Sequence, residues 1–236
     1  MSVRPPVIRG IVSVAIFAAA MGHAHAQSAA AWRPEWRTAA ETLLTRTLQA
    51  PLLPEGHLKL ADIGHEARLD ELEFYFPVEC LRPETLQQVL RQYLPHDRAM
   101  IRMAVAQLSF KEVRGYMKGY VDLVFRHQGR FYLVDYKSNR LGENGSDYTP
   151  EVLEQAMADA HYYLQYLIYC VALHRYLGQR LADYDWERDV GGVLYLFLRG
   201  MHPEHPARGV FFHKPSRELI EALDGLMGAV NKSSRF

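Results

Sequence analysis

The chain has 236 residues, 49% of them hydrophobic and 23% charged, which excludes a disordered chain and predicts one sizeable globular domain. Its 27 lysines and arginines balance its 27 aspartates and glutamates, which excludes a protein that holds nucleic acid through overall basicity alone. The two cysteines, Cys80 and Cys170, lack metal-ligand spacing; this excludes a disulfide framework and is typical of a reducing compartment.

Residues 1–26 have the pattern of a secretory signal peptide. A basic start is followed by an apolar run over 11–21 and by small residues before Gln27. The apolar run is too short to span a bilayer. Two interpretations remain open. The segment is an export signal, with Gln27 as the mature start in the periplasm, or it is non-native sequence upstream of a truncated reading frame in a cytoplasmic protein.

The first half of the chain predicts alternating helices and strands. Apolar spacing predicts a helix over 36–48 that ends before Pro51. Residues 71–76 are typical of a strand, and 83–94 of a helix with proline in its first turn. Residues 107–120 are expected to be strand-like and to lead into a β-hairpin.

The second half predicts an α/β arrangement as well. After a polar loop over 138–149, a single long helix is expected over 150–177, with apolar residues at spacings of three and four. The near-continuous apolar run over 190–198 predicts a buried strand whose first glycines allow a close approach. A final amphipathic helix is expected over 216–227. The His202-Pro-Glu-His-Pro206 loop favours solvated histidines over a metal pair.

The most informative segment is a predicted β-hairpin over 119–137. Both arms are rich in β-branched and aromatic residues, and Gln128-Gly129 provides a tight turn. If Arg126 pairs with Phe131, Asp122 lies opposite Asp135. Residues in directly opposed positions have their Cβ atoms roughly 4.5–5.5 Å apart.

Strand alternation places Lys137 on the same face as Asp135. Two carboxylates this close repel each other unless a cation lies between them, and hard oxygen donors favour Mg²⁺. A metal with an adjacent lysine is suited to phosphodiester hydrolysis. The alternative is a solvated ion pair at the end of a strand, which is common for Asp-x-Lys triplets. The second aspartate, Asp122, favours the functional interpretation.

Three motifs carry a resemblance to a known family: Gly119-x-x-Asp122, Asp135-x-Lys137 and Gln165-x-x-x-Tyr169. They resemble the motifs of the PD-(D/E)xK nucleases, and residues 33–230 are similar to nuclease domains of the RecB type. The resemblance implies a restriction-endonuclease-like core, with a central mixed β-sheet flanked by helices. It also implies a Mg²⁺-dependent DNA exonuclease or endonuclease that acts in double-strand break processing and recombinational repair.

The same resemblance implies the roles of individual residues. Asp122 and Asp135 would be metal ligands, with Asp135 the central catalytic carboxylate and Lys137 the catalytic lysine. Glu71 resembles an acidic residue that approaches the metal. Glu73 is expected on the same strand face, and a solvated strand edge remains an alternative for either glutamate.

DNA contacts are expected around this centre. The resemblance places Gln165 and Tyr169 against the DNA strand, on the helix face that His161 also shares. Tyr136 is a further candidate for DNA binding. Basic side chains that flank the hairpin are candidate phosphate contacts, with solvated surface charges as the alternative: Arg114, Lys118 and Arg140.

The chain departs from the family pattern at one point. The family has a metal-binding histidine on an upstream helix, in a Gly-x-x-x-His-x-x-x-Glu-like setting, and this helix would fall at or before residue 10 of this sequence. No such pattern occurs. Two hypotheses therefore stand: an active nuclease domain, or a catalytically impaired fragment that acts as a docking module for a strand-exchange recombinase.

The resemblance also bears on partners and location. It implies RecC- and RecD-type subunits as possible partners, gives no role to a membrane, and favours the cytoplasm over export. The sequence has no Gly-x-x-x-x-Gly-Lys-Ser/Thr phosphate loop, so no helicase motor is predicted in this chain.

Overall fold

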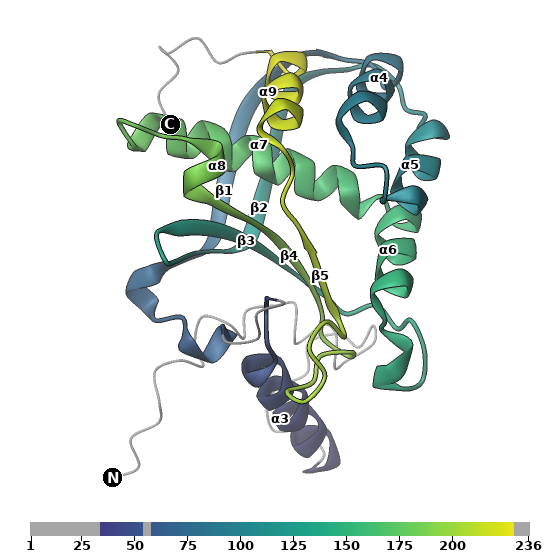
Figure 1. The fold of residues 1–236 in the computed structure, drawn as a ribbon, viewed down its shortest axis with the longest axis vertical. Helices are drawn as coiled ribbons and strands as arrows, with labels where there is room; N and C mark the ends of the chain where they lie inside the picture. Colours follow the sequence, from purple (N-terminus) through teal and green to yellow (C-terminus); the bar gives the residue numbers. More distant parts are fainter. Residues whose placement is uncertain (1–33, 54–57, 229–236) are drawn as a thin grey trace.

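A computed structural model describes residues 34–53 and 58–228 (Figure 1). The signal-like segment and the expected position of the upstream histidine helix lie outside these residues. Within them, the architecture is a mixed sheet with helices on both faces. This confirms the α/β class and the flanked central sheet.

The sheet has five strands in the spatial order β1-β2-β3-β4-β5. Only β3 and β4 run parallel, and every other neighbouring pair is antiparallel. The parallel pair is reached through a long helical crossover, as parallel strands require. The strands are β1 (Arg68–Leu81), β2 (Val113–His127), β3 (Arg130–Lys137), β4 (Val190–Phe197) and β5 (Val210–His213).

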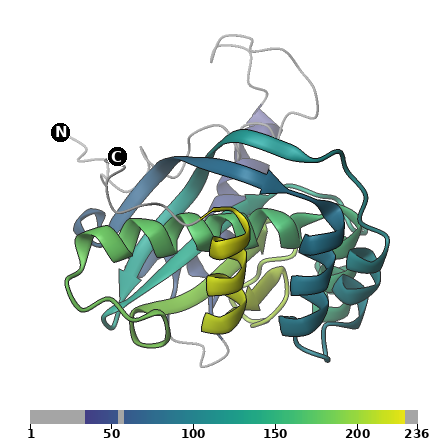
Figure 2. The same cartoon turned by 90° about the horizontal axis from the view of Figure 1, so that it is seen from above.

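Helices cover the two faces unequally (Figures 1 and 2). One face is covered by the group from α4 to α7 together with α9, whereas α3 lies against the other face. No helix in the described ranges is long and apolar enough to cross a membrane. The helices are α3 (Pro34–Gln49), α4 (Pro83–Tyr93), α5 (Ala99–Ala106), α6 (Pro150–Asp159), α7 (Tyr162–Arg180), α8 (Trp186–Asp189) and α9 (Arg217–Leu226), with single 3₁₀ turns η2 (Leu60–Asp62), η3 (His65–Ala67) and η4 (Gly145–Asp147).

Two hydrophobic cores result, one on each face of the sheet. Strand β4 contributes to both, because consecutive residues such as Val193 and Leu194 point to opposite faces of the sheet. Every residue of β4 is buried, as the apolar run predicts. The predicted close approach at its start is also confirmed: a Cβ on Gly191 would lie 2.1 Å from the ring of Tyr132.

The single long helix predicted over 150–177 is wrong. The chain forms α6 and α7, and His161 between them has left-handed backbone angles, with φ 53° and ψ 27°. Helix α6 packs against α5 at the side of the sheet, whereas α7 crosses the sheet face (Figure 1). One straight helix cannot make both contacts. His161 is exposed and does not share a helix face with Gln165 and Tyr169.

Three further elements differ from the prediction. Residues 107–112 are not in a strand, because α5 ends at Ala106 and β2 begins only at Val113. From there β2 continues without a break to His127, and it pairs with β1 along a long antiparallel ladder. The short elements α5 and β5 were not predicted, since each is too short to show a clear periodicity.

Candidate active site

The β2–β3 hairpin has the predicted register. Gln128 and Gly129 both have positive φ, at 49° and 82°, as a two-residue turn between twisted strands requires. Arg126 pairs with Phe131, and the ladder continues inward to Leu123 and Val134. Alternation from these pairs places Asp135 and Lys137 on the face covered by α7.

Asp122 extends this ladder with its side chain. The backbone pairs end one position before it, and its Oδ2 accepts a hydrogen bond of 2.9 Å from the backbone N–H of Tyr136. Its carboxylate thus reaches the β3 backbone beside Asp135. Burial raises the pKa of Asp122; the Tyr136 N–H and Lys137 act against this rise, and the charge of Glu71 adds to it.

The structure distinguishes the two candidate glutamates of β1. The β1–β2 register on both sides of Glu71 places this residue opposite Asp122. Glu71 is exposed and has a left-handed φ of 54°, a conformation that costs a non-glycine residue roughly 1 kcal/mol and is enriched at functional sites. Glu73 is instead held in an exposed ion pair with Lys118, with 2.6 Å between Oε1 and Nζ.

Asp135 and Lys137 form a buried ion pair. Their exposed fractions are 4% and 8%, and 2.6 Å separates Lys137 Nζ from Asp135 Oδ2. Burial raises the pKa of Asp135 to about 6; Lys137 opposes this rise and the nearby Asp122 carboxylate adds to it. The site therefore sets two carboxylates against one ammonium, and this excess of negative charge favours an additional cation.

Lys137 is held in position from several sides. Its Nζ donates a 2.8 Å hydrogen bond to Gln165 Oε1 and lies 3.8 Å from the ring centroid of Tyr162 and 4.9 Å from that of Tyr195. The Tyr195 hydroxyl donates to the same Gln165 oxygen at 3.0 Å, and Gln165 Nε2 donates to the Tyr169 hydroxyl at 2.8 Å. These contacts fix the direction of the ammonium group.

Gln165 and Tyr169 are therefore brought to the Asp135–Lys137 pair, as the sequence predicts. Burial raises the pKa of Tyr169 to about 12, with Asp135 as a further cause, so its hydroxyl is protonated at neutral pH. Sequence reasoning missed Tyr162 and Tyr195. The signal for Tyr195 is one hydroxyl in an apolar strand, and its meaning depends on the parallel pairing that sets it beside Asp135.

The other predicted DNA contacts lie elsewhere. Tyr136 packs against the core on the opposite face of the sheet, so its backbone N–H rather than its ring serves the Asp122 site. Arg140 is exposed three residues beyond Lys137 and pairs with Glu143. Along the β1–β2 pair, Arg114 pairs with Glu112 and Lys118 with Glu73.

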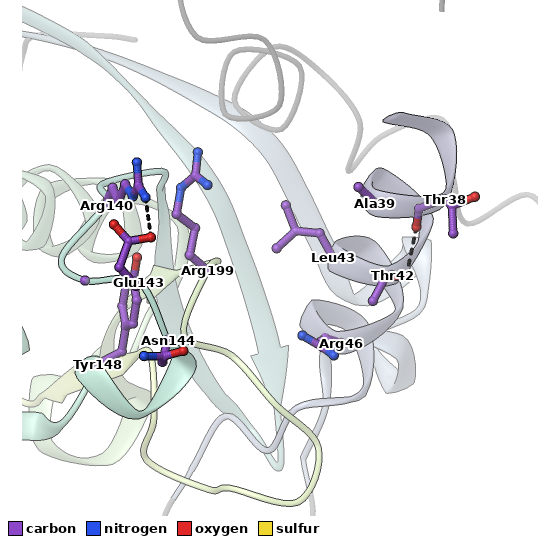
Figure 3. A pocket seen from close by; sticks show the side chains of 11 residues that line it. Thr38, Ala39, Thr42, Leu43, Arg46, Arg140, Glu143, Asn144, Tyr148 and Arg199 are labelled. Atoms are coloured by element: carbon purple, nitrogen blue, oxygen red, sulfur yellow. Dashed lines mark hydrogen bonds and ion pairs between the residues drawn. The ribbon is translucent and has the colours of Figure 1, made fainter. Parts of the chain in front are cut away.

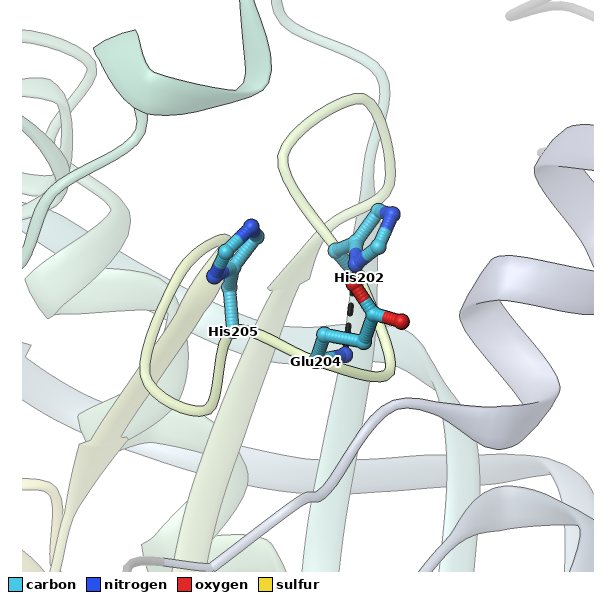
Figure 4. A group of neighbouring side chains, drawn as sticks. All are labelled: His202, Glu204 and His205. Carbon is cyan, nitrogen blue, oxygen red and sulfur yellow. Dashed lines mark hydrogen bonds between the residues drawn. The ribbon is translucent and has the colours of Figure 1, made fainter.

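The loop after β4 gathers His202, Glu204 and His205 (Figure 4). One potential ligand atom from each residue lies within 4.8 Å of those from the other two. No other trio of potential ligands within the described ranges is as compact, and this holds for Glu71, Asp122 and Asp135 as well. One ring nitrogen of His202 already accepts the Glu204 backbone N–H at 3.2 Å. Glu204 and His205 are exposed, which agrees with the expectation of solvated histidines.

The donor set around Asp122 and Asp135 fits a hard divalent cation. The bond from Tyr136 uses one carboxylate oxygen of Asp122, and the ion pair with Lys137 uses one of Asp135, so each residue has a second oxygen to offer. Glu71 can add a third carboxylate from β1. Few protein oxygens, with several waters retained, is the usual coordination of Mg²⁺ in proteins.

Comparisons with known proteins agree with this geometry. A family model described as the PD-(D/E)XK nuclease superfamily matches residues 16–230. The chain is 43% identical over 197 residues to the RecBCD enzyme subunit RecB of Escherichia coli, and 44% identical over 186 residues to that of Haemophilus influenzae. These matches cover 83% and 78% of this chain but only 16% and 14% of the relatives' lengths. The chain belongs to the PD-(D/E)XK nuclease superfamily.

Proposed function

We propose that the chain is a DNA nuclease domain of the RecB type that hydrolyses phosphodiester bonds with Mg²⁺. Its role would be in double-strand break processing and recombinational repair, with RecC- and RecD-type subunits as partners. The observation that carries this proposal is the buried Asp135–Lys137 pair, with the Asp122 carboxylate beside it and Gln165 fixing the lysine.

Asp122 and Asp135 would hold the metal, with Glu71 as a third ligand. When bound, Mg²⁺ supplies polarisation of the scissile phosphoryl group and a lower pKa for the attacking water. Asp135 still has an ionised carboxylate to offer at neutral pH, although burial raises its pKa to about 6. The bond from the Tyr136 N–H orients the Asp122 carboxylate before a metal arrives.

Lys137 would act on the charge that develops in the reaction. Its ammonium has three N–H groups, and the contacts with Asp135 and Gln165 occupy two of them. The remaining N–H can donate to the attacking water or to a phosphoryl oxygen as negative charge grows there. Gln165 uses both ends of its amide inside the site, so we assign it to positioning Lys137. We assign the Tyr169 hydroxyl to contact with the DNA strand.

Calorimetric titration with Mg²⁺ is the first test, using the wild type, Asp135→Ala and Lys137→Ala. We expect binding near millimolar affinity or tighter in the wild type and in Lys137→Ala, and loss of binding in Asp135→Ala. A His202→Ala/His205→Ala variant is the matched control, since it removes the one compact trio of potential ligands within the described ranges. It should bind Mg²⁺ like the wild type.

Cleavage of a labelled single strand then tests the chemistry. The wild type should cleave at millimolar Mg²⁺, whereas Lys137→Ala should bind the metal without cleaving. A wild type that neither binds Mg²⁺ nor cleaves DNA would contradict the proposal. Recombinase binding by that inactive protein, retained when both aspartates are replaced, would favour the docking module instead.

A further inference from the structure

An arginine-lined cavity of about 780 Å³ lies between α3 and the loops that follow β3 and β4. Figure 3 shows Arg140 and Arg199 side by side on one wall, with α3 and its Arg46 on the other. The Asn144 amide and the Thr42 hydroxyl, whose hydrogen is donated to the Thr38 carbonyl oxygen, are also part of the lining. The volume is comparable to sites that take ligands of about nucleotide size.

The charge of this cavity differs from that of the whole chain. Three arginines line it and Glu143 is its one acidic residue, although the chain as a whole has no net charge. Glu143 pairs with Arg140. The Nε of Arg199 donates a 3.1 Å hydrogen bond to the backbone oxygen of Ser138. This bond fixes the orientation of the planar guanidinium group. Such groups suit phosphate oxygens.

The cavity is connected to the Asp135–Lys137 pair through short contacts. The Leu198 N–H donates to the carbonyl oxygen of Lys137 at 3.0 Å, so Arg199 follows directly from a residue bonded to the catalytic strand. The Tyr162 ring lies under the Lys137 ammonium, and its hydroxyl donates to Asn139 Oδ1 at 3.2 Å, next to Arg140. These contacts place the starts of the two loops that carry Arg140 and Arg199 at the end of β3 where Lys137 lies.

We propose that this cavity binds backbone phosphates of a single DNA strand, adjacent to the phosphate being cleaved. This rests on the proposed function and adds the path of the substrate and the residues that hold it. Arg140 and Arg199 would bind the phosphates from the side of the sheet, and Arg46 would bind them from α3. Helix α3 thereby has a functional role in addition to covering the second core.

Strand binding is measured in an Asp135→Ala background, so that cleavage does not interfere. Fluorescence anisotropy with a labelled oligothymidylate compares Arg46→Gln/Arg140→Gln/Arg199→Gln with Arg91→Gln, a matched control on α4 at the opposite end of the molecule (Figure 1). Each lost phosphate contact on a single strand lowers the slope of log K against log salt by about 0.7. We expect the triple variant to lose about 2 from this slope and at least about tenfold in affinity at low salt.

A slope for the triple variant equal to that of Arg91→Gln would overturn the proposal. Thermal melting shows whether the variants are folded, and the single substitutions replace the triple if it is not. Inorganic phosphate, matched in phosphate groups, is then used as a competitor against the labelled strand. Competition as effective as that of an unlabelled oligonucleotide would mean that the cavity takes free phosphate, which also overturns a strand-binding role.

Cleavage by the otherwise wild-type protein separates the two proposals. If the arginines hold flanking phosphates, the triple variant should raise KM for a long strand more than it lowers kcat, and should change cleavage of a very short oligonucleotide much less. A wild type that does not cleave, with arginine-dependent strand binding intact, contradicts the catalytic proposal alone. A wild type that cleaves, with binding indifferent to the arginines, contradicts the cavity proposal alone.

Discussion

Helix α7 carries one buried cation, Arg175, and packs against another, Lys137, and the two are neutralised in different ways. Near its C-terminal half, Arg175 is 6% exposed, forms a 2.5 Å ion pair with Asp224, donates to the Gly228 carbonyl at 2.7 Å and stacks 4.5 Å from the Phe76 ring centroid. One carboxylate faces one guanidinium there, and backbone carbonyls take further N–H groups. This region joins α7 to α9.

Near the other end of α7, Lys137 faces two carboxylates. Burial, and to a smaller extent the second carboxylate, raise the pKa of Asp135 to about 6. With both carboxylates ionised, the folded protein has one negative charge in excess at this point. The Arg175 region balances its charge and serves stability. The Lys137 region leaves charge unbalanced, which costs stability without a metal and creates affinity for one.

Replacing Lys137 by alanine should have the largest effect of all. We expect cleavage to fall by at least about 10³-fold, because a donor to the developing charge is removed. The fold should persist, since Asp135 can take up a proton when its partner is gone. Single-turnover cleavage together with thermal melting checks both expectations. Cleavage within tenfold of the wild type would contradict a catalytic role for Lys137.

Replacing Arg175 by methionine should act on stability instead. The Asp224 carboxylate would lose its partner, and we expect the free energy of unfolding to fall by about 3 kcal/mol. Denaturant titration measures this change, and Arg180→Met is the control, because that guanidinium stacks on Tyr176 at an exposed position of the same helix. Cleavage per folded molecule should remain that of the wild type.

His213 offers a pH test of the same principle, as a buried group without an ionic partner. Its Nδ1 lies 3.0 Å from the Tyr166 hydroxyl, and burial, together with Arg98, lowers its pKa to about 3. The unfolded imidazole has a pKa of about 6.5, so between these values the unfolded chain binds more protons. The free energy of unfolding should therefore decrease as the pH is lowered through this window, by about 2 kcal/mol from pH 7 to pH 5.

The aspartates change stability in the opposite direction over part of this window. The folded-state pKa of Asp135 is raised to about 6, so acid protonates it more readily in the folded protein. The difference between the wild type and His213→Gln isolates the imidazole contribution, because both proteins keep Asp122 and Asp135. A difference that does not vary between pH 5 and pH 7 would contradict the assignment of a neutral, buried His213.

Asp122→Asn should have the smallest effect on stability. The amide oxygen can still accept the Tyr136 N–H while the excess negative charge is reduced, so we expect a gain of about 0.5 kcal/mol without metal, a small figure because this side chain is partly exposed. Mg²⁺ binding should be lost in the same variant. Chemical denaturation and calorimetry measure the two effects. A clear loss of stability would show that Asp122 serves the fold.

Local sequence determined a large part of this protein. The Gln128-Gly129 turn and the alternation of the flanking residues specified a register that the structure confirms, because hairpin pairing depends on neighbours in the chain. The buried strand over 190–198 could be predicted equally well, since every residue of β4 except Tyr195 is apolar or glycine and all are buried. The aspartates and Lys137 could be placed from this register.

The surroundings of the two aspartates and Lys137 depend on how distant elements pack together. The break at His161 follows from the different packing partners of α6 and α7, and the spacing of apolar residues in the sequence does not indicate those partners. Tyr195 reaches Asp135 through parallel pairing across a long crossover, and Arg46 reaches the cavity from an element more than ninety residues away in the chain. Local patterns specify what neighbours along the chain will form, whereas the electrostatics of the site depend on elements brought together by packing.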